Sequence, residues 1–504
     1  MKVSYRFVQI FGLILVTLLG VLLRFKGLNY REFWYDEAYT GLTIARNWSE
    51  MYALLLRDIH PPLYYILIKV WADIFGHTDF VIRSLSFVFG TLLIPASFIF
   101  VRRVVNYSKG FIPLFVSFVI AVNPFLIAYS QEARAYSLLA FLFLMAAYFF
   151  YFGLTKSPLK FNLDWLLFSI LVSLLFLTHY ISFFGIISFF IFMAAYYTKV
   201  KTFYKNGAFC KSKLKVANLI AMVLVIPVVV FSIWLPSFRI QRFYISNFGL
   251  TWGWIPKPEF SFIPKSLYAF LFGVERQAIG VPKVVEITPI LSSDSLAFIL
   301  FSVILGVSIY IIFKKRDKKE VFLPFVLTLW VLPIFFTIFA SFFGYNIYVE
   351  RYLIGYGVFF LIYLGLILSK FKKRKAYVLL VTAGFYMVIA STISVSYANL
   401  GYRKLAVELQ SAKGKIIFNN PFEFVVARYY LGKSFDSKIR IYDFASKDKY
   451  QGWALIENDQ VLKSLWQIKN EDILVTTNPP KNIDYKLSKK IEGFKIYENL
   501  TFSP

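Results

Sequence analysis

Long apolar segments recur along most of this chain, and they constrain its fold more than any other feature. A membrane helix needs roughly 17 to 25 mostly apolar residues, and the sequence offers about eleven such segments. Hydrophobic residues make up 58% of the 504 positions and charged residues 16%, far from the balance of a soluble protein. The sequence therefore predicts an all-α polytopic membrane protein. The predicted spans are about residues 7–23, 80–101, one ending near 128, 138–154, two short helices within 163–197, one ending near 235, 296–313, 321–343, 352–368 and 376–395.

The basic residues predict the orientation in the membrane. The formal net charge is +27, which could suggest a nucleic-acid partner. However, the lysines and arginines gather in short loops between apolar segments, such as residues 199–215, 314–320 and 370–375. This is the positive-inside bias of cytoplasmic loops, and it argues against nucleic-acid binding. With the N-terminus inside and an odd number of spans, the C-terminus lies outside. The single cysteine, Cys210, allows no internal disulfide.

The chain divides into two domains. Residues 1–397 form the membrane domain, with a first outer loop at 24–79 that contains amphipathic helices and a long outer loop at 236–295. Residues 398–504 lose the apolar runs and show short strand-like segments: KIIFNN, KIRIYDF, DILVTT and GFKIYEN. This tail is predicted to be a small extracytoplasmic α/β domain.

The first outer loop carries the most unusual polar residues. Asp36 and Glu37 follow the first span in the loop next to the membrane, and carboxylates near hydrocarbon are costly. Asp58 and His60 come before a Pro-Pro pair that fixes the backbone and starts a new helix. The conspicuous polar residues at other membrane ends map to the same outer side, which is where we expect the chemistry: Glu132, Arg134, His179, Glu350 and Arg351.

Five motifs together give the chain a family resemblance. They are WYDEAYT (34–40), DIHPPLYY (58–65), SQEARAY (130–136), HY (179–180) and ERYLI (350–354). About residues 1 to 400 resemble the GT-C superfamily of membrane glycosyltransferases, which includes protein O-mannosyltransferases and aminoarabinose transferases. The resemblance implies a GT-C-like fold and a hexosyl or pentosyl transferase. Such an enzyme moves a sugar from a polyprenyl-phosphate donor to a lipid, glycan or protein acceptor at the outer face of the cytoplasmic membrane.

The resemblance also implies roles for individual residues. Asp36 matches the general base that takes the acceptor's proton, and a single base with direct displacement inverts the anomeric centre. Glu132 matches a second acidic position of the family, and Glu37 and Glu132 are the candidates to orient the acceptor or to help hold a metal ion. The resemblance allows a divalent cation, for which Asp36 and Glu132 are the candidate ligands; no other cofactor is expected. The expected contacts to the donor phosphate are His60, Arg134, Tyr136, Arg351 and Tyr352.

Each of these residues also has a purely structural interpretation. Asp36 could be a solvated carboxylate, and Glu37 could cap a helix or pair with an arginine. His60 could be a turn residue, and His179 is expected to support a tight turn between two short helices. Arg351 could anchor a helix end by snorkelling. The histidines lack zinc-ligand spacing.

The motifs leave the sugar and the acceptor open. Tyr64 and Tyr65 stand where protein mannosyltransferases continue with Gly-Lys, and His60 stands where aminoarabinose transferases carry a lysine. The segment 236–295 and the tail are the expected sites of acceptor recognition.

A transporter or flippase of polyprenyl lipids is the alternative function. Transporters place charges near the middle of the bilayer on interrupted helices. In this chain the suspected site residues lie at helix ends on one side, which favours an enzyme.

Overall fold

The computed structural model describes most of the chain. The described residues are 5–28, 31–104, 111–156, 160–201, 209–247, 255–259, 261–273, 285–287, 294–314, 321–344, 346–370, 395–397, 401–442, 455–463, 467–477 and 484–501. The span predicted at 376–395 lies outside these residues, except for its last one.

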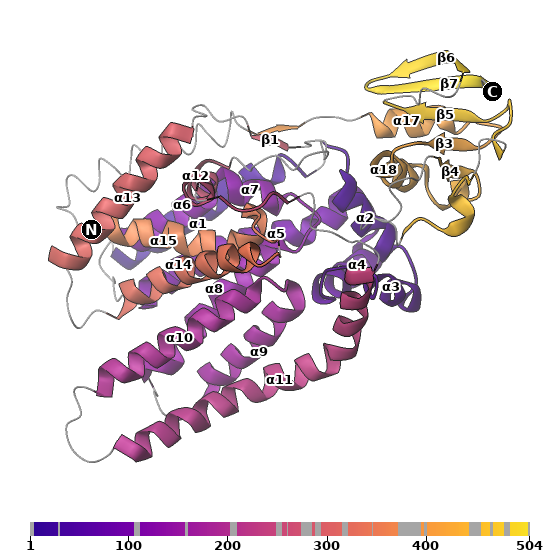
Figure 1. Cartoon of the computed structure of the whole chain (residues 1–504). Helices are drawn as coiled ribbons and strands as arrows, with labels where there is room; N and C mark the ends of the chain where they lie inside the picture. Colours follow the sequence, from indigo (N-terminus) through magenta and orange to yellow (C-terminus); the bar gives the residue numbers. More distant parts are fainter. Residues whose placement is uncertain are drawn as a thin grey trace.

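Membrane helices form the larger part of the molecule (Figure 1). Within the described residues, six helices are long and apolar enough to cross a membrane, and a pair of helices bent by 57° makes a seventh if the two are counted as one span. The prediction of an integral multi-pass protein is confirmed. The six are α1 (Tyr5–Phe25), α5 (Asp79–Val104), α8 (Tyr136–Lys156), α11 (Phe209–Asn247), α14 (Phe322–Phe342) and α15 (Ile354–Ser369); the bent pair is α6 (Ile112–Val122) and α7 (Pro124–Ser130). Shorter apolar helices are α9 (Leu163–Thr178), α10 (Ser182–Lys201), α12 (Phe262–Phe272) and α13 (Asp294–Lys314).

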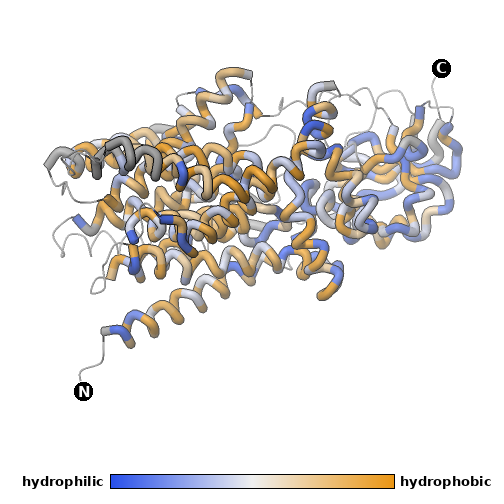
Figure 2. The backbone as a smooth tube through the Cα atoms, turned by 90° about the horizontal axis from the view of Figure 1, so that it is seen from below, coloured by the Kyte–Doolittle hydropathy of each residue, from blue (hydrophilic) through white to orange (hydrophobic). Residues whose placement is uncertain are grey.

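The exposed surface of these helices is apolar, as a lipid environment requires. On α11, Val225, Val228, Val229 and Ile233 are more than half exposed. At the centre of the bundle, Phe359 of α15 is completely buried. Apolar residues colour most of the bundle, whereas polar residues gather toward the C-terminal end (Figure 2). The helix bundle therefore has apolar side chains both in its core and on its exposed surface.

A buried arginine stabilises the bend between α6 and α7. Pro124 has no N–H, so the helix cannot continue through it, and carbonyl groups at the end of α6 lose their partners. Arg24 at the end of α1 donates to the oxygens of Ile120 at 2.9 Å and Ala121 at 2.7 Å. Its Nε also donates to Ser130 Oγ at 3.2 Å. The bend is thereby fixed, together with the turn that follows α7.

The predicted split of the apolar segment 163–197 is confirmed. Helix α9 ends at Thr178 and α10 begins at Ser182. His179 between them has an extended backbone, with φ −160° and ψ 129°, which no helix continues. The two helices turn back on each other at this histidine (Figure 1).

Three short helices build the first outer loop: α2 (Tyr35–Ile44), α3 (Trp48–Leu55) and α4 (Leu63–Phe75). On α4, Ile68 is buried, while Ile66, Val70 and Ile74 are 40%, 44% and 67% exposed. One face of α4 packs on the protein and its other face is apolar, as expected for a helix that lies along the membrane surface.

Helix α11 continues past the predicted end of its span. The segment 236–295 was expected to be an outer loop, but α11 runs through Pro236 to Asn247. Contacts with the first outer loop explain the extension. Tyr52 Oη bonds Ser237 Oγ at 2.9 Å, and Gln241 Nε2 donates to the carbonyl oxygens of Leu55 and His60 at 2.8 and 3.0 Å.

The tail forms the expected α/β domain around a mixed sheet of order β4-β3-β5-β7-β6. Strand β3 (Ile416–Phe418) pairs in parallel with β4 (Ile439–Ile441) and β5 (Ile473–Thr476). Strand β7 (Phe494–Thr501) is antiparallel to β5 and to β6 (Asp484–Ile491). The four strand-like runs of the sequence are therefore strands. Helices α17 (Tyr402–Leu409) and α18 (Pro421–Leu431) pack on this sheet, and a separate two-stranded sheet joins β1 (Val285–Ile287) to β2 (Val395–Tyr397).

The C-terminal domain docks on the first outer loop through α18. The ring of Tyr429 stacks on Phe33 at 4.9 Å. A Cβ added to Gly41 would lie 2.5 Å from the Tyr429 ring, so only glycine permits this approach of α2 to α18. Asp79 at the start of α5 accepts bonds from Tyr429, Tyr430 and Arg403 at 2.9, 2.8 and 2.7 Å. The tail thus contacts the elements that carry Asp36 and its neighbours.

We expect Asp79→Asn to loosen this docking, because an amide cannot accept all three hydrogen bonds. The loss should be about 1–3 kcal/mol of unfolding free energy, measured by denaturant unfolding in detergent, together with faster protease cleavage near residue 398. Asp164→Asn is the control, since Asp164 is paired only with an exposed lysine at 3.8 Å. Equal stability of the two variants would contradict the docking role.

Candidate active site

Glu37 lies at the centre of a buried ionic cluster. Its two carboxylate oxygens accept from Arg83 Nε and Nη2, both at 2.7 Å, and Arg31 Nη2 lies 3.4 Å from Oε1. All three side chains are completely buried. Burial alone would raise the pKa of the Glu37 carboxyl, but the charges of Arg31 and Arg83 outweigh burial and hold it below the ordinary 4.5. This is the arginine-pairing interpretation of Glu37; the predicted acceptor-orienting role stays a prediction.

The same carboxylate holds the turn that carries Arg134. The backbone N–H of Ala133 donates to Glu37 Oε1 at 3.0 Å, and Arg31 donates to the carbonyl oxygen of Gln131. Asp36 precedes Glu37 in the first turn of α2, and Arg134 follows Ala133. The ionic cluster therefore fixes both the chain segment before Asp36 and the turn before Arg134.

Asp36 and Arg134 face each other as a consequence. Arg134 Nε lies 3.9 Å from Asp36 Oδ2, close enough for electrostatic attraction but too far for a hydrogen bond. The Asp36 side chain is 24% exposed and that of Arg134 is 9% exposed. Asp36 is accessible to a reactant and retains lone pairs that could accept a proton.

His60 links Arg134 to a second buried carboxylate. Arg134 Nη2 lies 3.0 Å from His60 Nε2, and His60 Nδ1 lies 3.1 Å from Asp58 Oδ1. A guanidinium can only donate, so Nε2 accepts and Nδ1–H donates to Asp58. Tyr65 Oη also donates to Asp58, at 3.0 Å. Burial alone would raise the pKa of Asp58, but His60 and Arg134 hold it below its ordinary value.

Aromatic rings connect Arg351 to the same place. The Arg351 guanidinium lies 5.7 Å from the ring centres of both Trp34 and Tyr352. The Tyr352 ring lies 6.3 Å from that of Tyr136 and 4.8 Å from that of His179. Arg351 thus lies beside Trp34, the residue before α2, and beside Tyr352.

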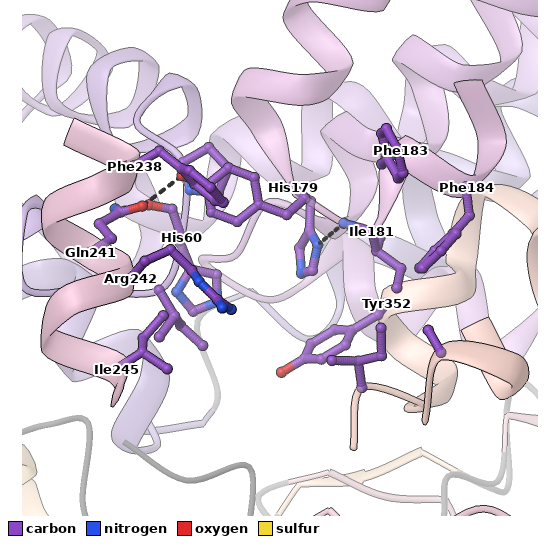
Figure 3. Close-up of a pocket in the computed structure, with 15 residues that line it drawn as sticks. His60, His179, Ile181, Phe183, Phe184, Phe238, Gln241, Arg242, Ile245 and Tyr352 are labelled. Carbon is purple, nitrogen blue, oxygen red and sulfur yellow. Dashed lines mark hydrogen bonds between the residues drawn. The ribbon is translucent and has the colours of Figure 1, made fainter. Parts of the chain in front are cut away.

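A cavity of about 460 Å³ adjoins these residues (Figure 3). Its apolar lining comes mainly from the membrane helices α10, α11 and α14, which would suit a hydrocarbon chain. Its polar lining comes from the segment before α4, from the turn between α9 and α10, from α11 and from Tyr352 before α15. The lining consists of Ile59, His60, Pro61, His179, Tyr180, Ile181, Phe183, Phe184, Phe238, Gln241, Arg242, Ile245, Ala340, Ile347 and Tyr352.

The two candidate cation ligands have different surroundings. Glu132 is 8% exposed, and its carbonyl accepts from Arg134 N at 2.8 Å in the turn after α7. Asp36 faces the Arg134 guanidinium, whose positive charge disfavours a cation at the same carboxylate. Among the described residues, no group of three His, Cys, Asp or Glu side chains could hold a metal ion.

The structure brings most of the predicted site residues into one contact network: Asp36, His60, Arg134, Tyr136, Arg351 and Tyr352. Sequence reasoning did not select Arg83 or Gln241. Arg83 had a signal, because a charged residue inside a predicted apolar span calls for a partner. Gln241 had none, since its role depends on the unforeseen extension of α11.

Residues 59–231 match the protein family described as dolichyl-phosphate-mannose-protein mannosyltransferase. This segment contains His60, Arg134, Tyr136 and His179, but it begins after Asp36 and ends before Arg351. For this region the match agrees with the predicted family resemblance. The chain matches no curated protein.

A solved oligosaccharyltransferase is similar to this chain in fold. The oligosaccharyltransferase AglB of Archaeoglobus fulgidus, in complex with an inhibitory peptide and a dolichol-phosphate, has a TM-score of 0.50 at 13% identity, over 84% of this chain and 64% of that one. The same enzyme in complex with zinc and sulfate gives 0.48 at 15% identity, over 83% and 61%. ArnT of Cupriavidus metallidurans bound to undecaprenyl phosphate gives 0.45 at 14% identity, over 96% and 97%. The chain spans less than two thirds of the length of the oligosaccharyltransferase.

We predict that Glu37→Gln destabilises the protein by about 3–5 kcal/mol, because it removes the buried carboxylate that pairs with Arg83 and Arg31. Denaturant unfolding in detergent measures the loss. Glu408→Gln is the control: Glu408 is 38% exposed and pairs with Lys489, itself 53% exposed, so its loss should cost about 0–1 kcal/mol. If Glu37→Gln matches the control, the cluster is not a structural centre.

The pKa of Glu37 makes this difference dependent on pH. Because its folded pKa lies below 4.5, ionised Glu37 contributes stability that is complete above that pH and is lost as the pH falls through the folded pKa. The stability difference between wild type and Glu37→Gln should therefore be constant well above pH 4.5 and shrink below it. A difference that grows on acidification would contradict the assignment.

Proposed function

We propose that the protein transfers a sugar from a polyprenyl-phosphate donor to an acceptor at the outer membrane face, with inversion and with Asp36 as general base. One observation carries the proposal. An accessible carboxylate, Asp36, lies 3.9 Å from the buried cation Arg134, and Arg134 is bonded to His60, which lines a cavity with apolar walls. A base, a phosphate-binding cation and room for a hydrocarbon chain are what this reaction needs.

The transfer forms one bond and breaks one. The acceptor's nucleophilic atom attacks the anomeric carbon, and the bond from that carbon to the phosphate oxygen breaks. The bonding electron pair leaves with the phosphate, which becomes polyprenyl phosphate. The acceptor's proton passes to the Asp36 carboxylate. Arg134 Nε lies 3.9 Å from Asp36 Oδ2, too far to donate a hydrogen bond to this oxygen. No step of this scheme requires a metal ion; a cation at Asp36 and Glu132 stays a prediction.

Arginines suit the leaving group. A phosphate that gains negative charge as the bond breaks is stabilised by preorganised donors in a dry site. Arg134 is oriented by His60 and by the turn that Glu37 holds, and Arg351 is oriented by the rings of Trp34 and Tyr352. Tyr136 and Tyr352 lie close enough to complete the phosphate site.

We propose the outer face as the side of reaction and eleven crossings as the topology. The short helices α9 and α10 would each cross, which places His179 and the first outer loop on the same side. This arrangement agrees with the basic loops on the opposite side and with an extracytoplasmic C-terminal domain. The acceptor is a lipid, glycan or protein that reaches Asp36 from outside.

We expect Asp36→Asn to lose sugar transfer by about a hundredfold or more, because an amide cannot accept the proton. The assay is transfer from a polyprenyl-phosphate sugar by protein reconstituted in liposomes, with binding of polyprenyl phosphate measured in parallel. Binding should persist, since the phosphate-binding arginines remain. Asp73→Asn, remote from the site, is the matched control.

The same assay separates an enzyme from a transporter. A wild-type protein that moves polyprenyl lipid across the bilayer without transferring sugar would support the transporter. Full transfer by Asp36→Asn would remove Asp36 as the base.

A further inference from the structure

We propose that His179 binds the phosphate of the donor lipid through a neutral Nε2–H group. This inference deepens the proposed function, on which it rests, by naming a ligand contact at a residue that sequence analysis expected to support a turn. The hydrogen bond that His179 Nδ1 accepts in the turn decides that the proton of the neutral ring is on Nε2, the atom proposed to bind the phosphate.

A backbone hydrogen bond fixes the tautomer of His179. The N–H of Ile181 donates to His179 Nδ1 at 3.2 Å (Figure 3). An imidazole nitrogen that accepts carries no proton, so in the neutral ring the proton is on Nε2. The turn between α9 and α10 thus presents Nε2–H as a donor of fixed orientation.

This donor has no partner among the described residues. Nε2 is a buried atom, and no described residue accepts a hydrogen bond from it. A buried donor without an acceptor costs about 1–3 kcal/mol. The cost is removed when a ligand supplies an acceptor, and His179 lines the cavity next to the candidate site.

The surroundings of the ring favour an anionic acceptor. His179 lies 5.9 Å from His60 and 4.8 Å from Tyr352, measured between ring centres. Burial lowers the pKa of His179 well below its ordinary value, and His60, Arg134 and Arg351 lower it further. The ring therefore stays neutral, and the cations near it are Arg134 and Arg351. An acceptor-only group with negative charge, such as a phosphate ester, fits both the cations and the unused N–H.

Two substitutions separate the turn from the binding role. His179→Asn keeps an acceptor near the position of Nδ1 for Ile181 N–H but removes the donor at Nε2. His179→Gln keeps a donor near the position of Nε2 but loses the turn acceptor. His77→Asn is the matched control, because the His77 side chain is 43% exposed and its Nε2 lies 3.4 Å from the exposed carboxylate of Asp73.

The experiment measures binding of three probes to the full-length protein in detergent: undecaprenyl phosphate, undecaprenol and inorganic phosphate. We expect His179→Asn to weaken undecaprenyl phosphate about ten- to hundredfold, the worth of one hydrogen bond to a charged group. Undecaprenol binding should be unchanged. His179→Gln should bind undecaprenyl phosphate more tightly than His179→Asn, and His77→Asn should match wild type. Stronger binding of inorganic phosphate than of the lipid would identify a free-phosphate site.

The outcomes distinguish the two proposals. If wild type binds undecaprenyl phosphate no better than undecaprenol, the proposed function fails and this inference fails with it. If wild type prefers the phosphate and His179→Asn keeps that preference, only the role of His179 is overturned. An equal loss of both lipids in His179→Asn would likewise overturn it, because that result indicates a role in the turn alone.

Discussion

The buried carboxylate of Glu37 joins three parts of the chain that are far apart in sequence. Glu37 belongs to the first outer loop, Arg83 to a membrane helix, and Ala133, whose N–H donates to the same carboxylate, to the turn after α7. A charge buried this deeply is tolerated only with such partners. The arrangement leaves little freedom for the residues on either side, and these are Asp36 and Arg134. The proposed chemistry therefore depends on a cluster that takes no part in the reaction itself.

The C-terminal domain continues this support outside the membrane. Asp79 and Arg83 lie one turn apart on α5, so that Asp79 contacts α18 while Arg83 holds Glu37. Glu32, in the loop before α2, accepts the first N–H groups of α17 at 2.9 and 2.7 Å. These contacts give the tail a structural role beside the acceptor recognition that the sequence analysis expected of it. Helix α2, which carries Asp36, is therefore held by α5 through Arg83 and by α18 of the tail.

Much of this architecture was predictable, because hydrophobic length and turn residues act locally. The apolar runs gave the spans, the polar cluster around His179 gave the break between α9 and α10, and four apolar runs gave strands of the tail. Strand β6 was missed because its sequence, DYKLSKKI, is rich in charge, as edge strands often are. The extension of α11 was missed because it is stabilised by Gln241 contacts to residues far away in sequence. The candidate site followed from residue types at membrane ends, whereas the partner of Glu37 required three-dimensional information.

The most direct test is a structure of the protein with a polyprenyl phosphate bound. The account predicts that the phosphate lies within hydrogen-bonding distance of Arg134, with Asp36 facing the position of the sugar. The hydrocarbon chain should occupy the cavity between α10, α11 and α14. A phosphate bound elsewhere, with the Asp36 and Arg134 side chains facing only solvent, would contradict the assignment of this site.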